Sequence, residues 1–179
     1  MGKKTGDFRR PEPLSRDDEP VQKIRCPIHG FIHYSRNERR IIDHPIFRRL
    51  RAIRQLALTE YVYPGATHSR FEHSLGVMEV ATRAFESLCS RHGASLQSHF
   101  RQHPYFRRQP LDRARQILRL AALLHDVGHA PFSHAVESLM HGEHGHEALS
   151  VKIIKCDELE GGRCGCSASV GNGIFGRRG

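Results

Sequence analysis

An apolar helix that ends in adjacent histidine and aspartate residues constrains this chain more than any other segment. The run AALLHDVGH occupies residues 121–129, and helical steps back from His125 meet only apolar side chains. These are Ala121, Leu118, Ala114 and Leu111. We therefore expect a helix packed into a core, with His125 at its buried end. A buried imidazole needs a polar partner, so the end of this helix is a candidate functional site.

The two side chains at the helix end suit a metal ion. Gly128 and Pro131 break the helix directly after the pair, and Asp126 lies about 100° around the helix from His125. Both side chains then face the opening where the helix stops. Imidazole and carboxylate ligands together suit Zn, Fe, Mn or Mg. The alternative is a histidine satisfied by a backbone carbonyl beside a surface aspartate, and an isolated pair favours this alternative.

The chain carries a strong positive charge. Its formal net charge is +9, and arginines are concentrated within residues 36–54. Such a cluster attracts nucleic acid, nucleotide phosphates or an acidic partner, although a solvated helix face has the same composition. The absence of Trp and the low aromatic content disfavour stacking platforms for single strands. The cluster comprises Arg36, Arg39, Arg40, Arg48, Arg49, Arg51 and Arg54.

Cysteine usage and hydropathy indicate a reducing compartment. The five cysteines form no even framework, and Cys164 and Cys166 are too close for a CxxC zinc motif. No apolar run reaches 18 residues, and there is no signal-peptide core. We therefore expect a cytoplasmic protein that does not interact with a membrane.

Composition divides the chain into three parts. Residues 1–20 mix charges with prolines and lack an apolar period, which is typical of a flexible leader. Residues 160–179 are rich in glycine and lack any helical or strand period, so we expect a disordered tail or a prematurely ended or frameshifted chain. A single domain of residues 21–159 lies between them.

Periodic patterns predict a hairpin followed by helices. Two extended pieces flank a Pro-to-Gly turn within residues 24–34. Ser35 and Glu38 have capping-box spacing at the start of a first helix. The further elements expected are a second helix after Pro45 carrying Ile46, Leu50, Ile53 and Ala57, a loop over 61–66, a helix over about 69–90, a polar connector over about 93–110, the helix to His125, and a helix over about 146–155.

His73 lies on the helix expected over about residues 69–90. This helix has one apolar stripe through Phe71, Leu75, Met78, Phe85 and Leu88, and a second through His73, Val77, Val80 and Ala84. A helix that is apolar on two sides is expected to be central. A lone histidine in such a row is more often a satisfied core residue than a metal ligand.

Three islands of sequence together resemble a known family. They are RFEHSLGV at residues 70–77, HDVGHAPFSH at 125–134, and the pair His146 and Glu147. With PIHG at 27–30 and YPGATHSR at 63–70, they resemble the HD-domain metal-dependent phosphohydrolases. The resemblance is closest to the dNTP triphosphohydrolase branch, which includes the sterile-alpha-motif and HD-domain protein. It covers roughly residues 24–155 and implies an all-α fold, an HD-domain helical bundle with a short N-terminal β-hairpin.

The resemblance implies a divalent metal ion held by His73, His125 and Asp126. His73 is thereby expected to be a ligand rather than a core histidine. The implied reaction is the attack of activated water on the α-phosphorus of a dNTP, which releases a deoxynucleoside and triphosphate. Relatives are commonly oligomeric, so a homo-oligomer is expected by resemblance.

Substrate contacts are implied as well. Arg70 and His129 match residues at the phosphates, where a guanidinium fits an anionic substrate. Gln55 matches a residue near the deoxyribose. In some relatives a regulatory nucleotide contacts residues that correspond to Asp43 and Arg51, although a helix cap and a surface arginine explain these two equally well.

Proton transfer is assigned by resemblance to three residues. His134 matches a candidate general acid, and Glu137 and His146 match a pair in which the carboxylate orients the imidazole. An ordinary exposed helix glutamate explains Glu137 about as well. The family's fourth metal ligand is an aspartate far downstream, and Asp157 does not match its position. We therefore expect a chain truncated before that ligand.

Three functions stay open at this point. The leading hypothesis is a metal-dependent nucleotide phosphohydrolase acting on dNTPs. The second is an HD phosphohydrolase that acts on another nucleotide or on a nucleic-acid end. The third is a truncated, inactive HD protein that binds partners or nucleic acid through its arginine-rich surface, because loss of a carboxylate ligand weakens both metal affinity and folding.

Overall fold

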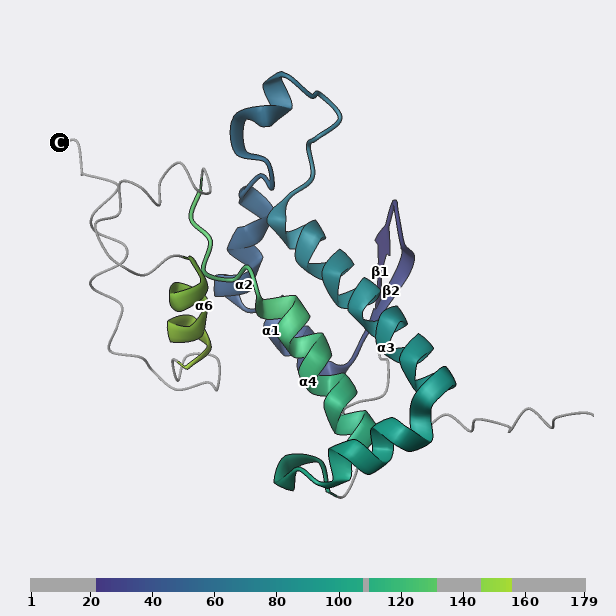
Figure 1. Ribbon diagram of the computed structural model, residues 1–179. Helices are drawn as coiled ribbons and strands as arrows, with labels where there is room; N and C mark the ends of the chain where they lie inside the picture. Colours follow the sequence, from purple (N-terminus) through teal and green to yellow (C-terminus); the bar gives the residue numbers. More distant parts are fainter. Residues whose placement is uncertain (1–21, 108–109, 132–145, 156–179) are drawn as a thin grey trace, which may run out of the picture.

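Two long helices form the centre of the molecule (Figure 1). The computed structural model describes residues 22–107, 110–131 and 146–155. Helix α3 (Arg70–Arg101) lies beside α4 (Pro110–Leu124), and the two run in opposite directions. This arrangement brings the start of α3 next to the end of α4.

A short antiparallel hairpin precedes the helices. Strand β1 (Gln22–Cys26) pairs with β2 (Gly30–Tyr34) in a register that sets Ile24 opposite Ile32. Gly30 has a φ of 77° at the end of the turn, a conformation that favours glycine. Ile32 is fully buried, so the hairpin contributes to the core. The predicted helical fold with an N-terminal hairpin is confirmed.

Helix α1 (Arg36–Ile42) begins at the predicted capping box. The Ser35 hydroxyl accepts a hydrogen bond from the Glu38 N–H at 3.2 Å. In return the Glu38 carboxylate accepts one from the Ser35 N–H at 2.8 Å. Two of the backbone donors at the helix start are thereby satisfied. Helix α2 (Pro45–Arg48) follows with Pro45 in its first turn, where the missing N–H costs nothing.

The second predicted helix is shorter than its apolar spacing indicated. Helix α2 passes into η1 (Arg49–Ala52), and Ile53 is extended, with φ −106° and ψ 115°. The Ile53 carbonyl accepts a hydrogen bond from the Arg70 N–H at 2.8 Å, and the Gln55 N–H donates to a carbonyl just before α3. These backbone groups of Ile53 and Gln55 therefore bond to the segment at the start of α3, and the helix ends before them. The prediction that Ala57 belongs to this helix is wrong.

Helix α3 begins as predicted but is longer than its apolar pattern. Ser69 caps it with a second capping box, and after a break at His92, where φ is −132° and ψ is 21°, the helix resumes and continues to Arg101. The predicted boundary near residue 93 coincides with this break, but the prediction of a non-helical connector is wrong for residues 93–101, which are helical. The rings of Phe100 and Phe106 lie 5.1 Å apart and hold this end of α3 against η3 (Pro104–Phe106).

One hydrophobic core lies among the hairpin and helices α1 to α4. Helix α6 (His146–Ile154) forms as predicted, and Ile153 packs against this core. The second apolar stripe predicted for α3 is buried only in part, since Val77 packs against the core but Val80 is 53% exposed. Among the described helices, none has the length and apolar character needed to cross a membrane. The core comprises Ile32, Tyr34, Ile42, Phe47, Leu50, Ile53, Phe71, Leu75, Met78, Ala122, Leu123, Leu124 and Val127.

An exposed segment separates η1 from α3. It contains η2 (Ala57–Tyr61), in which Ala57 has a positive φ of 50°, and the loop predicted over residues 61–66. Both Tyr61 and Val62 are largely exposed. The segment projects from the body of the molecule at the top of Figure 1.

Candidate metal centre

Asp126 lies at the centre of a cluster of basic and ionisable side chains. It is the second residue after α4 and is only 6% exposed. Its Oδ2 accepts a hydrogen bond from Arg70 Nη1 at 2.6 Å. The Nε2 atoms of His125 and His129 lie 3.3 and 3.7 Å from Oδ1, and His73 Nε2 lies 3.8 Å from Oδ2. One buried carboxylate thus faces a guanidinium and three imidazoles.

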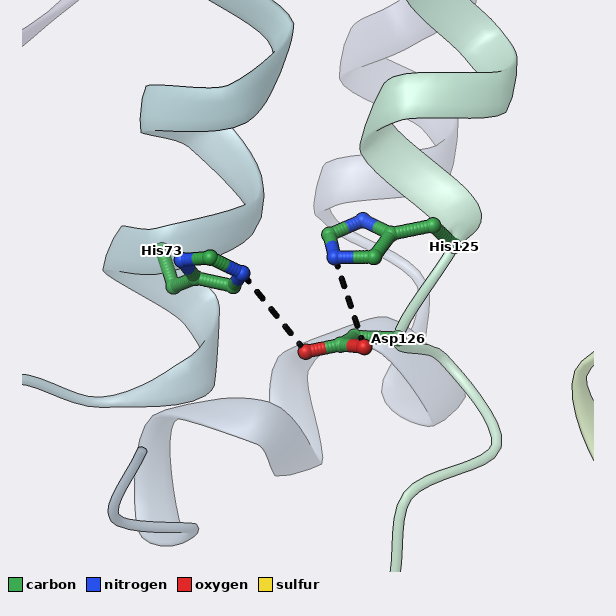
Figure 2. A group of neighbouring side chains, drawn as sticks. All are labelled: His73, His125 and Asp126. Atoms are coloured by element: carbon green, nitrogen blue, oxygen red, sulfur yellow. Dashed lines mark ion pairs between the residues drawn. The ribbon is translucent and has the colours of Figure 1, made fainter. Parts of the chain in front are cut away.

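Three of these side chains form a set of metal donors. His73, His125 and Asp126 each offer one ligand atom, and these atoms all lie within 4.8 Å of one another. Figure 2 shows the two imidazoles facing the carboxylate, one from α3 and the other from the end of α4. Two imidazole nitrogens and a carboxylate oxygen are a donor set that suits a divalent transition-metal ion or Mg²⁺.

The His125 ring is oriented by its own helix. Its Nδ1 lies 2.8 Å from the Ala122 carbonyl, so Nδ1–H donates there and the lone pair of Nε2 faces the cluster. The prediction that His125 is buried is wrong. Its side chain is 36% exposed and that of Asp126 is 8% exposed, because the turn after Leu124 carries Asp126 inward.

The environment of His73 favours the neutral form of its ring, which suits metal binding. Burial lowers the pKa of this imidazole, and the attraction of the Asp126 carboxylate raises it in opposition. The positive charge of Arg70 and the neighbouring His125 act in the lowering direction. The net lowering favours the neutral ring, which is the form that ligates a metal.

The structure places the other predicted site residues at different distances from this cluster. His129 is 3% exposed and belongs to it. The backbone pairing described above brings Gln55 beside the start of α3, and its side-chain Oε1 is buried without a hydrogen-bond partner in the described part of the chain. His146 is the first residue of α6. His134 and Glu137 lie outside the described residues.

Sequence analysis missed two side chains that hold the turn after α4. Arg49 donates to the backbone carbonyls of Val127 and His129, and Ser150 contacts the backbone on the other side of the turn. The cluster of arginines was expected at the surface, but Arg49 points inward. Its role had no sequence signal, because neither its spacing nor its neighbours differ from those of the adjacent arginines.

The comparisons with known proteins agree with this geometry. The family model described as the HD domain matches residues 70–163, which is more than half of the chain. An uncharacterised protein of Methanocaldococcus jannaschii is 38% identical over 140 residues, which are 78% of this chain and 25% of that protein. The deoxynucleoside triphosphate triphosphohydrolase SAMHD1 of Bos taurus is 41% identical over 116 residues, 65% of this chain and 18% of the relative.

A solved structure shares the fold. The crystal structure of a hypothetical protein from Aquifex aeolicus superimposes with a TM-score of 0.56 and 33% sequence identity. The match covers 78% of this chain and 32% of that one. The chain therefore spans about a third or less of the length of the relatives that it matches.

Proposed function

This chain belongs to the HD-domain phosphohydrolase family, and from that membership we propose that it is a metal-dependent enzyme that hydrolyses a dNTP to a deoxynucleoside and triphosphate. The observation that carries the proposal is the buried Asp126 carboxylate with His73 and His125, whose ligand atoms lie within 4.8 Å of one another. The similarity to a deoxynucleoside triphosphate triphosphohydrolase supports the choice of substrate class.

The donor atoms fit a divalent ion of the Zn, Fe, Mn or Mg group. His125 presents Nε2 because its Nδ1 is engaged by a backbone carbonyl, and His73 is held in the neutral form by burial. Asp126 supplies the negative charge. A divalent ion held by these residues would polarise a phosphoryl oxygen and make a water molecule more acidic. Three protein ligands leave coordination positions open, as is usual in catalytic zinc sites.

Other residues of the cluster suit a nucleotide. The Arg70 guanidinium lies against Asp126 and brings positive charge and hydrogen-bond donors to the place where we expect the phosphates, and the His129 imidazole lies beside it. Gln55 Oε1 is a buried acceptor that a sugar hydroxyl would satisfy, and an unsatisfied buried acceptor costs about 1–3 kcal/mol. By resemblance we assign proton transfer to His134, Glu137 and His146.

The test is the identity of the products. The chain is freed of metal, reloaded with Mn²⁺ and incubated with dGTP in H₂¹⁸O. Water attack on the α-phosphorus breaks the bond between that phosphorus and the 5′ oxygen. We therefore expect deoxyguanosine without label and one ¹⁸O atom in triphosphate, measured by ion-exchange chromatography and mass spectrometry.

Matched variants decide whether the cluster is responsible. Asp126→Asn keeps the size of the side chain but removes its charge, and we expect it to be inactive. Glu86→Gln makes the same change at an exposed carboxylate and serves as the control. Release of pyrophosphate or phosphate by the wild type, or equal activity in both variants, contradicts the proposal. Cleavage of ribonucleotides or oligonucleotide ends in place of dGTP favours the second substrate class.

A further inference from the structure

The turn that carries Asp126 is buried but not helical, so its backbone groups need partners outside the turn. Val127 is fully buried and His129 is 3% exposed. Two of these groups form hydrogen bonds within the turn. The Val127 N–H donates to the Leu124 carbonyl and the His129 N–H donates to the Asp126 carbonyl, both at 3.1 Å. A buried backbone group without a partner costs about as much as a lost hydrogen bond.

Arg49 holds one side of this turn. It lies at the start of η1, far from the turn in sequence. Its Nη1 donates to the His129 carbonyl at 2.7 Å, and its Nη2 donates to the Val127 carbonyl. The two nitrogens of one planar guanidinium thereby fix two carbonyls of alternate residues.

Ser150 holds the other side. It lies in the middle of α6 and is 4% exposed. Its hydroxyl accepts a hydrogen bond from the Gly128 N–H at 2.8 Å and donates one to the His125 carbonyl at 3.1 Å. A single hydroxyl thus bridges two residues that flank Asp126 and Val127. Arg49 and Ser150 together engage the carbonyls of three residues and one N–H in this turn.

We propose that Arg49 and Ser150 are positioning residues of the metal centre, which set the metal affinity of the Asp126 site without touching the ligand side chains. The inference rests on the proposed function. Asp126 lies between backbone groups that these two side chains hold, so a shift of the turn moves its carboxylate. Metal–ligand distances tolerate deviations of only about 0.2 Å, and such a shift therefore weakens binding.

Conservative variants with matched controls test the inference. Arg49→Lys keeps the positive charge but loses the pair of guanidinium nitrogens that donate to two carbonyls at once. Arg48→Lys makes the same change at an exposed neighbour. Ser150→Ala removes the bridging hydroxyl. Ser74→Ala removes an equally buried hydroxyl that has no hydrogen-bond partner in the described part of the chain. The dissociation constant for Mn²⁺ is measured by calorimetry on the full chain, and the melting temperature is measured in chelator.

We expect Mn²⁺ binding to weaken about 10-fold in Arg49→Lys and in Ser150→Ala, and to be unchanged in both controls. In Ser150→Ala the Gly128 amide is expected to exchange its hydrogen faster than in Ser74→Ala. If the two variants only melt earlier in chelator and bind Mn²⁺ as the wild type does, the residues are merely structural and the inference is wrong while the proposed function stands. If the wild type binds no divalent metal, both the proposed function and the positioning role are wrong.

Discussion

Two buried arginine–carboxylate pairs lie along α4. One involves Arg119 within the helix, and the other involves Asp126, just after its end. In the middle, Arg119 Nε donates to Glu38 Oε1 at 2.6 Å and Nη2 donates to Oε2 at 2.9 Å. The guanidinium also reaches Thr82 Oγ1 at 2.7 Å and the His33 carbonyl at 2.8 Å. Both side chains of this pair are 7% exposed. Partners from three other elements therefore surround the charges.

Within the described part of the chain, the pair that follows the end of the helix has fewer hydrogen bonds. Asp126 contacts Arg70 at 2.6 Å, whereas the imidazole nitrogens of His125, His129 and His73 lie 3.3, 3.7 and 3.8 Å away. These distances exceed the usual hydrogen-bond range of about 2.7–3.2 Å. The two pairs share their chemistry and burial, so neither property alone marks a site. The difference is that His125 Nε2, whose ring donates through Nδ1 to the Ala122 carbonyl, keeps a lone pair that faces Asp126 and can bind a metal ion.

The largest effect is expected from breaking the pair in the middle of α4. Arg119→Met leaves the buried Glu38 charge without compensation, so the free energy of unfolding should fall by about 3–5 kcal/mol, as measured in urea. Arg115→Met, which breaks an exposed pair on the same helix, should cost about 0–1 kcal/mol. The double variant Glu38→Gln with Arg119→Met should be more stable than Arg119→Met. Equal losses of unfolding free energy in Arg119→Met and Arg115→Met would contradict the structural role of the Arg119–Glu38 pair.

Metal removal should affect only the pair at the end of the helix. With free Mn²⁺ at 100 times its dissociation constant, the wild type should gain about 2.7 kcal/mol over the protein in chelator. Arg115→Met should gain the same amount, since its site is intact. Asp126→Asn should gain nothing, because a ligand is missing. Thermal melts with and without chelator measure this, and a metal-dependent shift in Asp126→Asn would place the ion elsewhere.

In chelator the same aspartate should matter less than Arg119. Asp126→Asn should lower the free energy of unfolding by about 1.5 kcal/mol, since the amide oxygen still accepts a hydrogen bond from Arg70. Urea unfolding of the metal-free proteins measures this loss. A loss as large as that of Arg119→Met would make the Asp126 pair structural as well.

The smallest effect is expected from pH. Because burial lowers the pKa of His73 below its usual 6.5, the unfolded chain binds a proton in the window below pH 6.5 that the folded chain does not. The stability from this neutral ring is complete above pH 6.5 and falls as the pH decreases from there. His73→Gln should therefore show a shallower loss of stability than the wild type between pH 6.5 and 5. Water screens this partly exposed ring, which keeps the difference small. Parallel pH profiles in chelator would contradict it.

The contrast between the pairs also shows what the sequence could predict. His73, His125 and Asp126 stand in short motifs at the start of α3 and the end of α4, and the opposed directions of these helices bring the motifs together. The grouping of these three residues is therefore as the resemblance implied. Their burial was not predictable from helical steps, because the turn after α4 changes which side chains face inward.

The pair of Arg119 and Glu38 had no signal in the sequence. Glu38 was identified as a capping residue, and that role is confirmed, but its partner lies 81 positions away. Periodicity places charged residues at the surface, so a buried arginine is visible only when the helices are packed. The same reason hid Arg49, whose carbonyl partners lie about 80 positions further along the chain.

The most direct test of the metal site is the metal content of two proteins that differ only in the carboxylate or amide group of residue 126. Wild type and Asp126→Asn are purified in parallel, loaded with Mn²⁺, passed over a desalting column and analysed by mass spectrometry for metal per chain. The account predicts one ion per wild-type chain and none in the variant, with Glu86→Gln matching the wild type. Equal metal in Asp126→Asn, or none in the wild type, would contradict the assignment of the site.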